Sequence, residues 1–152
     1  MRLASMNSSS TPAIRMPATE PLFGTTAATM PALATVLVVE DHDEMRAALR
    51  DWLLTSLPPL RLREARNMDE ALRLAEQATL DFALVNVELP GPNGIETARE
   101  LRRRFPGCPV VVMSVHESEA LRLAAIDAGA DAFVSKRELT TSLLPLVRRY
   151  IK

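Results

Sequence analysis

Apolar residues form two alternating kinds of pattern between residues 35 and 150. Short continuous apolar runs are typical of strands that are buried on both faces of a parallel sheet. Such runs occur at residues 35–39, 81–87, 109–113 and 132–134. Residues 60–65 alternate instead between apolar and charged side chains, which predicts an edge strand.

Between these strands, apolar residues recur at the spacing of one helix face. The first helix follows Asp41 and ends before Pro58, because proline cannot continue a helix. The second begins at the N-cap Asn67, and Glu70 completes a predicted capping box. Three further helices are predicted over about 94–105, 117–127 and 138–150. The predicted apolar stripe of the first helix consists of Met45, Ala48, Leu49, Trp52 and Leu53.

Strands that alternate with helices through short connections predict a parallel sheet with helices on both faces. We expect residues 34–152 to form one such α/β domain. Residues 1–33 are rich in Ser, Thr, Pro and Ala and show no periodicity, which predicts a disordered tail. Arg2 and Arg15 give this tail a weak similarity to a transit peptide, and we prefer the disordered tail.

Composition narrows the class of protein. The chain has 152 residues, 47% of them hydrophobic, and a formal net charge of −1, so overall charge predicts no attraction to nucleic acid or to membranes. No apolar run reaches the roughly 18 residues of a membrane span. The single cysteine, Cys108, cannot form an internal disulfide, which favours a reducing compartment and predicts a cytoplasmic protein.

Polar residues stand where the predicted strands end. The carboxyl ends of parallel strands share one edge of the sheet, so we expect residues far apart in sequence to meet there. Carboxylate and amide oxygens suit a divalent cation, and a lysine with a hydroxyl can hold phosphoryl oxygens. The residues concerned are Glu40, Asp41, Asn86, Glu88, Ser114 and Lys136.

Four segments together resemble the receiver domain of response regulators, in particular chemotaxis-regulator-like receivers. They are Val-Val-Glu-Asp at 38–41, Leu-Pro-Gly-Pro-Asn-Gly at 89–94, Ser114, and Gly-Ala-Asp-Ala-Phe-Val-Ser-Lys at 129–136. The resemblance covers about residues 35–150. It implies a flavodoxin-like, doubly wound, five-stranded parallel sheet in the order 2-1-3-4-5. It also implies a role in two-component, phosphorelay signalling and no enzymatic activity.

The resemblance assigns roles around a metal ion. Glu40 and Asp41 match the acidic pair that positions Mg²⁺. Glu88 matches the residue whose backbone carbonyl completes the metal shell. Asn86 matches the phospho-accepting aspartate, which is also a metal ligand.

A second group of roles concerns the phosphoryl group. Ser114 matches the hydroxyl that moves onto it, and Phe133 matches the switch aromatic. Lys136 matches the lysine that ties the phosphoryl group to the loop after strand five, and Gly94 matches the glycine that ends the loop after strand three.

Asn86 is the main departure from the receiver pattern. An aspartyl phosphate forms when a carboxylate oxygen attacks phosphorus, and an amide oxygen is a poor nucleophile. We therefore expect no phosphorylation here and weak or absent Mg²⁺ binding. Asn86 could bridge Lys136 with Asp41 or Ser114 without a metal, because an amide both donates and accepts. Lys136 could also act as a fixed cation beside Asp41.

These observations predict a single-domain receiver that works through protein contacts and independently of phosphorylation. The expected partners are a sensor histidine kinase or phosphotransfer protein, an effector in trans, and a second copy through the surface of helix four, strand five and helix five. The alternative is an ordinary Mg²⁺-dependent receiver with an introduced Asp-to-Asn change at residue 86. A flavin carrier or an aspartate-based phosphatase fits poorly, because acids crowd residues 40–44 and residue 86 lacks a carboxylate.

Overall fold

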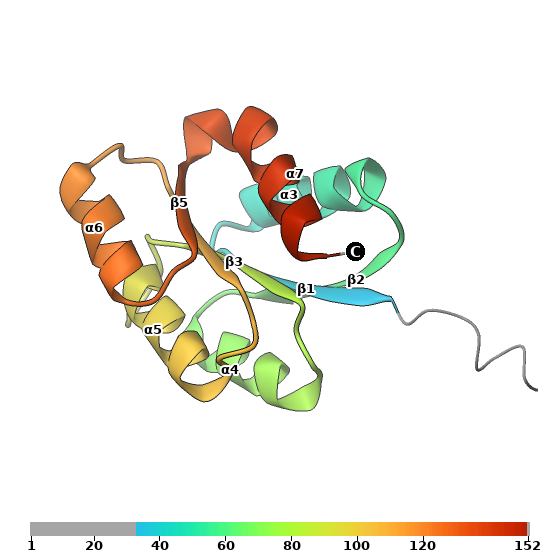
Figure 1. Cartoon of the computed structure of the whole chain (residues 1–152), viewed down its shortest axis with the longest axis horizontal. Helices are drawn as coiled ribbons and strands as arrows, with labels where there is room; N and C mark the ends of the chain where they lie inside the picture. The colour runs from blue at the N-terminus through green and yellow to red at the C-terminus, as the bar shows by residue number, and fades with distance from the viewer. Residues whose placement is uncertain (1–32, 152) are drawn as a thin grey trace, which may run out of the picture. The chain divides into compact units, whose positions relative to one another are not determined.

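The structure, a computed structural model, describes residues 33–151 (Figure 1). Its strands are β1 (Ala34–Val39), β2 (Leu60–Ala65), β3 (Phe82–Asn86), β4 (Val110–Ser114) and β5 (Ala132–Ser135). Its helices are α3 (Asp43–Ser56), α4 (Met68–Gln77), α5 (Gly94–Arg104), α6 (Glu119–Asp127), the 3-10 helix η1 (Lys136–Glu138) and α7 (Leu139–Tyr150). Strands and helices alternate as predicted. The tail predicted for residues 1–33 lies outside the described residues, apart from Leu33.

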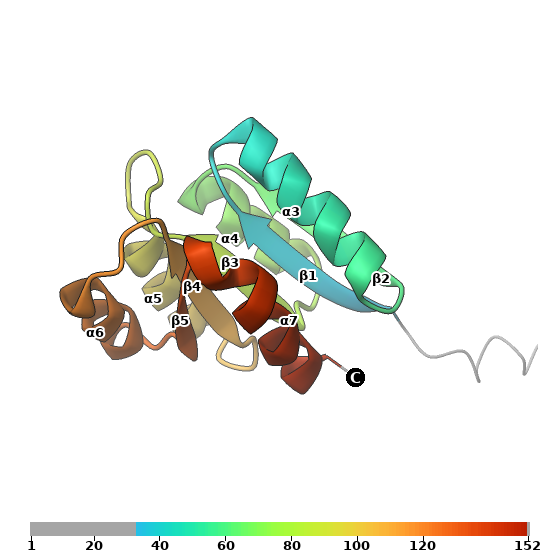
Figure 2. The ribbon, with the colours of Figure 1, turned by 90° about the horizontal axis from the view of Figure 1, so that it is seen from above.

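All five strands run parallel, in the order β2-β1-β3-β4-β5. From β1 the chain moves outward to β2, and it then crosses back past β1 to build β3, β4 and β5. Figure 2 shows this sheet from above, with helices on both sides. The predicted fold class and strand order are confirmed. In such a sheet, ligand sites lie at the carboxyl ends of the strands, where the winding reverses between β1 and β3.

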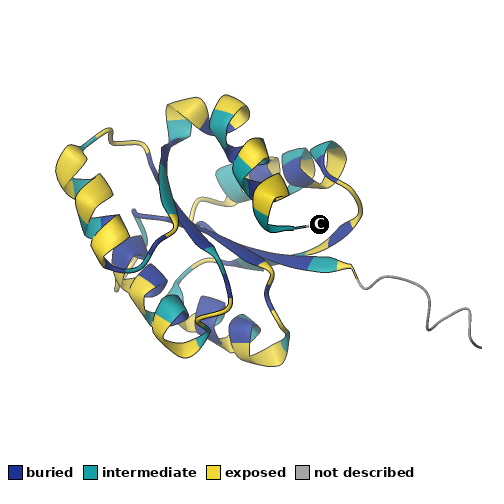
Figure 3. Ribbon diagram, viewed as in Figure 1, coloured by how far each residue is buried: buried dark blue, intermediate teal, exposed yellow. Residues whose placement is uncertain are grey.

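Alternate side chains of β1 enter two hydrophobic cores, one on each face of the sheet. Leu37 and Val39 belong to the core formed with α4, α5 and α6. Val36 and Val38 belong to the core formed with α3 and α7. All four are fully buried, as expected for a central parallel strand. Figure 3 shows the consequence, since the central strands are mostly dark and the outer helix faces are yellow.

Helix α3 buries a narrower stripe than predicted. Leu49 and Leu53 are buried, and Met45 and Trp52 are half-buried against the same core. Ala48, which we expected to face inward, is exposed. It lies about 100° around the helix from Leu49, and its short side chain does not reach the sheet.

Of the two hydrogen bonds in the capping box predicted for α4, one forms and the other does not. Asn67 Oδ1 accepts from the Glu70 N–H at 2.9 Å as expected, but the Glu70 carboxylate accepts from the Arg66 N–H, one residue outside the N-cap. A complete capping box forms instead at α5, where Asn93 and Glu96 each accept a hydrogen bond from the other's N–H, at 3.0 and 2.9 Å.

Two aspartates join neighbouring strands at the amino edge of the sheet. Asp81, which we expected inside the third strand, immediately precedes β3, and its carboxylate accepts from the Thr35 N–H of β1 at 2.8 Å. Asp131 precedes β5 and accepts from the Val110 N–H of β4 at the same distance. Each aspartate also donates its own N–H to the carbonyl of the residue it holds. Within residues 33–151, no helix is both long and apolar enough to cross a bilayer.

Candidate functional site

Four strand ends bring the predicted polar residues together at the carboxyl edge. Glu40 follows β1, Asn86 ends β3, Ser114 ends β4, and Lys136 follows β5. The first three are 1%, 2% and 0% exposed, although their side chains are polar. Buried polar groups need partners, so their hydrogen bonds decide what this edge can do.

The Glu40 carboxylate is the centre of this group. One of its oxygens, Oε1, accepts from Lys136 Nζ at 2.8 Å. The other, Oε2, accepts from Asn86 Nδ2 at 3.3 Å and from the His42 N–H at 3.1 Å. The sequence left open that Asn86 bridges Lys136 with Asp41 or Ser114 and that Lys136 lies beside Asp41. Both side chains donate to Glu40 instead, and Asp41 is exposed. A lysine on a buried carboxylate offsets the cost of burying its charge.

The Asn86 amide is held on its nitrogen side. Nδ2 donates to the Glu88 backbone carbonyl at 2.6 Å as well as to Glu40. Its oxygen, Oδ1, is buried without a hydrogen-bond partner among the described residues. The amide N–H groups therefore contact two oxygens, Glu40 Oε2 and the Glu88 carbonyl, that the resemblance assigns to a metal ion.

A metal ion at this position would require the Asn86 amide to reorient. Cations bind oxygen, so the Asn86 amide would have to turn its oxygen inward and lose both hydrogen bonds. Among residues 33–151, no three His, Cys, Asp or Glu side chains are grouped to hold a metal ion by themselves. A cation here would also need amide and backbone oxygens.

Glu88 contributes its side chain as well as its carbonyl, which the sequence analysis missed. Ser114 Oγ donates to Glu88 Oε2 at 2.8 Å and accepts from the His116 N–H at 3.0 Å. Glu88 Oε1 is buried without a hydrogen-bond partner among the described residues. An acid two positions after the end of β3 was the available signal, because its side chain can reach the end of β4.

The loop between β4 and α6 is also tied to the start of η1. Glu117 accepts from Ser135 Oγ at 3.1 Å and forms an ion pair with Arg137 at 2.7 Å. Phe133, the predicted switch aromatic, is half-buried against the core under α6. It lines a hollow of about 240 Å³ together with Glu117 and Arg122.

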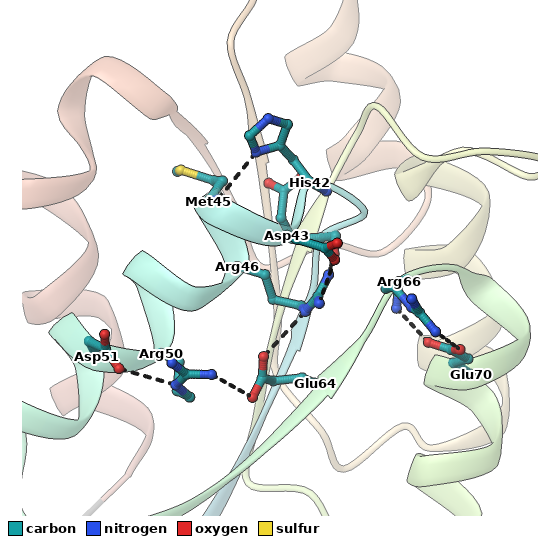
Figure 4. A network of polar contacts seen from close by, with 10 residues as sticks. His42, Asp43, Met45, Arg46, Arg50, Asp51, Glu64, Arg66 and Glu70 are labelled. Atoms are coloured by element: carbon teal, nitrogen blue, oxygen red, sulfur yellow. Dashed lines mark hydrogen bonds and ion pairs between the residues drawn. The ribbon is translucent and has the colours of Figure 1, made fainter.

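Arg46 is a further residue that the sequence analysis did not single out. From the first turn of α3 it donates to the Glu40 backbone carbonyl at 2.9 Å. It also donates to Asp43 at 2.7 Å and to Glu64 of β2 at 3.2 Å (Figure 4). It thereby fixes the backbone that carries Glu40. Its hydrogen bond and charge hold the pKa of the Asp43 carboxyl below its usual value. His42 is the N-cap of α3, with Nδ1 accepting from the Met45 N–H.

Gly94 sets how closely α5 approaches the site. A Cβ at this position would overlap the backbone carbonyl of Asn86. The Gly94 N–H donates to the carbonyl of Val87 at 2.8 Å, so the start of α5 packs directly on the end of β3. The resemblance singled out Gly94, and the structure supplies the steric reason.

Comparison with known proteins agrees with this architecture. The family model described as the response regulator receiver domain matches residues 36–148. The chain therefore belongs to the response regulator receiver domain family. Receiver domains act in two-component signalling, where they interact with histidine kinases and effectors, and they typically bind Mg²⁺ at their phosphorylation site. They are generally not enzymes themselves.

Several curated proteins are related in sequence. The transcriptional activator protein ExaE of Pseudomonas putida is 36% identical over 116 residues, which cover 76% of this chain and 54% of that protein. The nitrate/nitrite response regulator protein NarL of Escherichia coli (strain K12) is 33% identical, over 68% of this chain and 48% of NarL. A cyclic di-GMP phosphodiesterase of Thermotoga maritima is 37% identical, over 67% of this chain and 27% of that protein. The chain spans about half the length of these relatives, or less.

Solved structures show the same fold. A LuxR-family two-component response regulator from Aurantimonas sp. SI85-9A1 aligns with a TM-score of 0.70 at 27% identity, covering 79% of this chain and 89% of that one. The response regulator domain of Thermotoga maritima CheB aligns with a TM-score of 0.69 at 27% identity, covering 78% and 96%.

Proposed function

We propose that this receiver domain works without phosphorylation of its own site and acts through protein–protein contacts. Asn86 stands at the end of β3, where the resemblance places the phospho-accepting aspartate. An amide cannot become an acyl phosphate, so the covalent step is lost. The observation that carries the proposal is the pair of hydrogen bonds from Asn86 Nδ2 to Glu40 and to the Glu88 carbonyl.

These two bonds support a site held together by N–H donors. Lys136 and Asn86 supply the positive and partly positive groups that balance Glu40. In a receiver with a third carboxylate at residue 86, repulsion among the acids would favour a bound cation. Weak or absent Mg²⁺ binding is therefore part of the proposal, with Glu40, Asp41 and the Glu88 carbonyl as the remaining oxygen donors.

The direct test is treatment with acetyl phosphate and Mg²⁺, read by intact mass. We expect no added phosphoryl group on the unchanged chain and one on the Asn86→Asp variant. Asn93→Asp is a matched control, because it adds the same charge at the exposed N-cap of α5 and should stay unmodified. A phosphoryl group on the unchanged chain, or none on Asn86→Asp, would contradict the proposal.

Metal binding is tested by titrating Mg²⁺ and following the amide NMR signals of residues 40, 41 and 86–88. Asn86→Asp should bind roughly ten times more tightly than the unchanged chain or more, because it restores a third carboxylate. Equal affinities would refute this part of the proposal.

An ordinary receiver with an introduced change at residue 86 remains the alternative. Glu40, Asp41, Ser114 and Lys136 all keep the residue types that the resemblance requires. An aspartate codon at position 86 in the encoding gene would favour this alternative, and an asparagine codon would exclude it.

We infer that partners bind the surface of α6, β5 and α7, including the loop before α6. Three large apolar side chains are exposed on this side: Val115 (56%), Leu123 (54%) and Ile126 (42%). The partners proposed are a sensor histidine kinase or phosphotransfer protein, an effector and a second copy of this chain. Leu123→Ser should weaken self-association in analytical ultracentrifugation, whereas Leu54→Ser, on the exposed side of α3, should not.

We also propose that this domain has no enzymatic activity of its own and makes no direct contact with nucleic acid. The arginines at the end of α5 support the second point, because Arg103 and Arg104 both pair with Glu100. A cytoplasmic location belongs to the same proposal, since a single cysteine suits a reducing compartment.

A further inference from the structure

We propose that the Glu88 carboxylate is an internal anion that occupies the Ser114 hydroxyl and so fixes the loop between β4 and α6. This inference rests on the proposed function and extends it to the regulation of the same site. It gives a reason why the site can hold one state with no phosphoryl group on residue 86.

The hydrogen bonds of Ser114 carry the argument. A serine hydroxyl has a single proton to donate. Ser114 is fully buried and gives this proton to Glu88 Oε2 at 2.8 Å, while its oxygen accepts from the His116 N–H at 3.0 Å. The hydroxyl therefore has no proton left for a second anion. Any phosphoryl oxygen or other anion that needed Ser114 would first have to displace Glu88.

The second oxygen of Glu88 suggests a role beyond stability. Glu88 Oε1 is buried and has no hydrogen-bond partner within residues 33–151. A buried, unpaired carboxylate oxygen costs free energy, so a side chain selected for stability alone would point it to water or to a donor. The carboxylate charge also strengthens the bond from Ser114, because hydrogen bonds to an ionised acceptor are stronger than neutral ones.

The loop after Ser114 is where this bond takes effect. His116 is tied back to Ser114, and Glu117 is tied to Ser135 and Arg137. The loop is thus held at both ends, once by Ser114 and once by η1. It carries the exposed Val115, which belongs to the surface proposed for partners. If Ser114 lost its bond to Glu88, the attachment of His116 to Ser114 would loosen, and the attachment to η1 would remain.

Hydrogen exchange of the His116 amide tests the inference on the full chain, with no phosphoryl donor present. Glu88→Ala should speed this exchange roughly tenfold, since Ser114 loses its fixed orientation. Ser114→Ala should have an effect of similar size, and the double variant should show no further increase, because both changes break one chain of bonds. Glu88→Gln should lie between the wild type and Glu88→Ala, because an amide oxygen accepts more weakly than a carboxylate.

Two controls separate a local effect from a general loss of stability. Glu44→Ala removes an exposed acid near the same edge and should leave His116 exchange unchanged. The amide of Leu72, a buried residue of α4, reports global unfolding, and its rate should change less than that of His116 in every variant. An unchanged His116 rate in Glu88→Ala, or additive effects of Glu88→Ala and Ser114→Ala, would overturn the inference. Since no phosphoryl donor is used, these results are independent of whether residue 86 accepts a phosphoryl group.

Discussion

At the amino edge of the sheet, Asp81 and Asp131 each accept a backbone N–H from the neighbouring strand, at 2.8 Å. At the carboxyl edge, Glu40 and Glu88 bind mainly other side chains, from Lys136, Asn86 and Ser114. Carboxylates therefore stand at both edges, and their partners differ. At the amino edge the donors are backbone N–H groups of strands, which the sheet holds in place. At the carboxyl edge the donors are mainly side chains, which can rearrange.

The two edges also differ in what they leave unpaired. The buried side-chain oxygens without a partner within residues 33–151 are Asn86 Oδ1 and Glu88 Oε1, both at the carboxyl edge. Such groups cost free energy when they stay unpaired, so they mark the places where the fold is not optimised for stability alone. The amino edge thus serves the fold, and the carboxyl edge carries the site at some cost to stability.

The largest effect is expected from Gly94→Ala, at the carboxyl edge. The new Cβ would overlap the Asn86 carbonyl, so α5 or the end of β3 must move. We expect a loss of roughly 3 kcal/mol or more in the free energy of unfolding, measured by urea denaturation. Gly107→Ala at the amino edge is the matched control, because nothing lies within 4 Å of its Cβ. A loss of similar size in both variants would show that close backbone packing is not particular to the site.

A smaller loss is expected from Lys136→Met. This change leaves the Glu40 carboxylate, 1% exposed, without its cationic partner, and should cost about 2–3 kcal/mol in urea denaturation. The neighbouring Arg137→Met breaks an exposed ion pair with Glu117 and should cost about 0.5 kcal/mol or less. Equal losses would mean that burial of Glu40 does not set the strength of this pair.

The two edges are compared directly by Asp81→Ala and Asp41→Ala. Asp81→Ala leaves the N–H of the buried Thr35 without its carboxylate and should cost about 1 kcal/mol. Asp41→Ala removes an exposed acid and should change stability by about 0.5 kcal/mol or less. In the Asn86→Asp background, however, Asp41→Ala should weaken Mg²⁺ binding, and Asp81→Ala should not. The opposite pattern would reverse the roles assigned to the two edges.

The smallest expected effect is the change in the free energy of unfolding with pH that comes from Cys108, at the amino edge. Burial raises the pKa of the Cys108 thiol from 9.0 to about 12. Between these two pKa values the folded state keeps the thiol proton and the unfolded state loses it. The free energy of unfolding therefore falls as the pH rises through the pKa that the thiol has in the unfolded chain. At pH 9 the wild type should have lost about 0.4 kcal/mol more than Cys108→Ala, relative to pH 7, in urea denaturation. Parallel pH profiles of the two proteins would rule out this contribution.

The sequence by itself determined the alternation of strands and helices, the parallel sheet and the set of strand-end residues. Hydrophobic periodicity is a local property, and parallel strands must place their carboxyl ends on one edge, so Glu40, Asn86, Ser114 and Lys136 could be grouped from the chain alone. The order of the strands followed from the resemblance to receivers, and the structure confirms it.

Tertiary structure decided which of these residues contact one another. Lys136 could have met Asp41 or Glu40, and only the path of β5 relative to β1 places its amine 2.8 Å from Glu40. Glu88 was predicted through its carbonyl, but the spacing of β3 and β4 brings its carboxylate to Ser114. Arg46 became part of the site because α3 packs its first turn beside the ends of β1 and β2. A hydrogen bond depends on ångström distances between residues far apart in sequence, and packing sets those distances where local pattern does not.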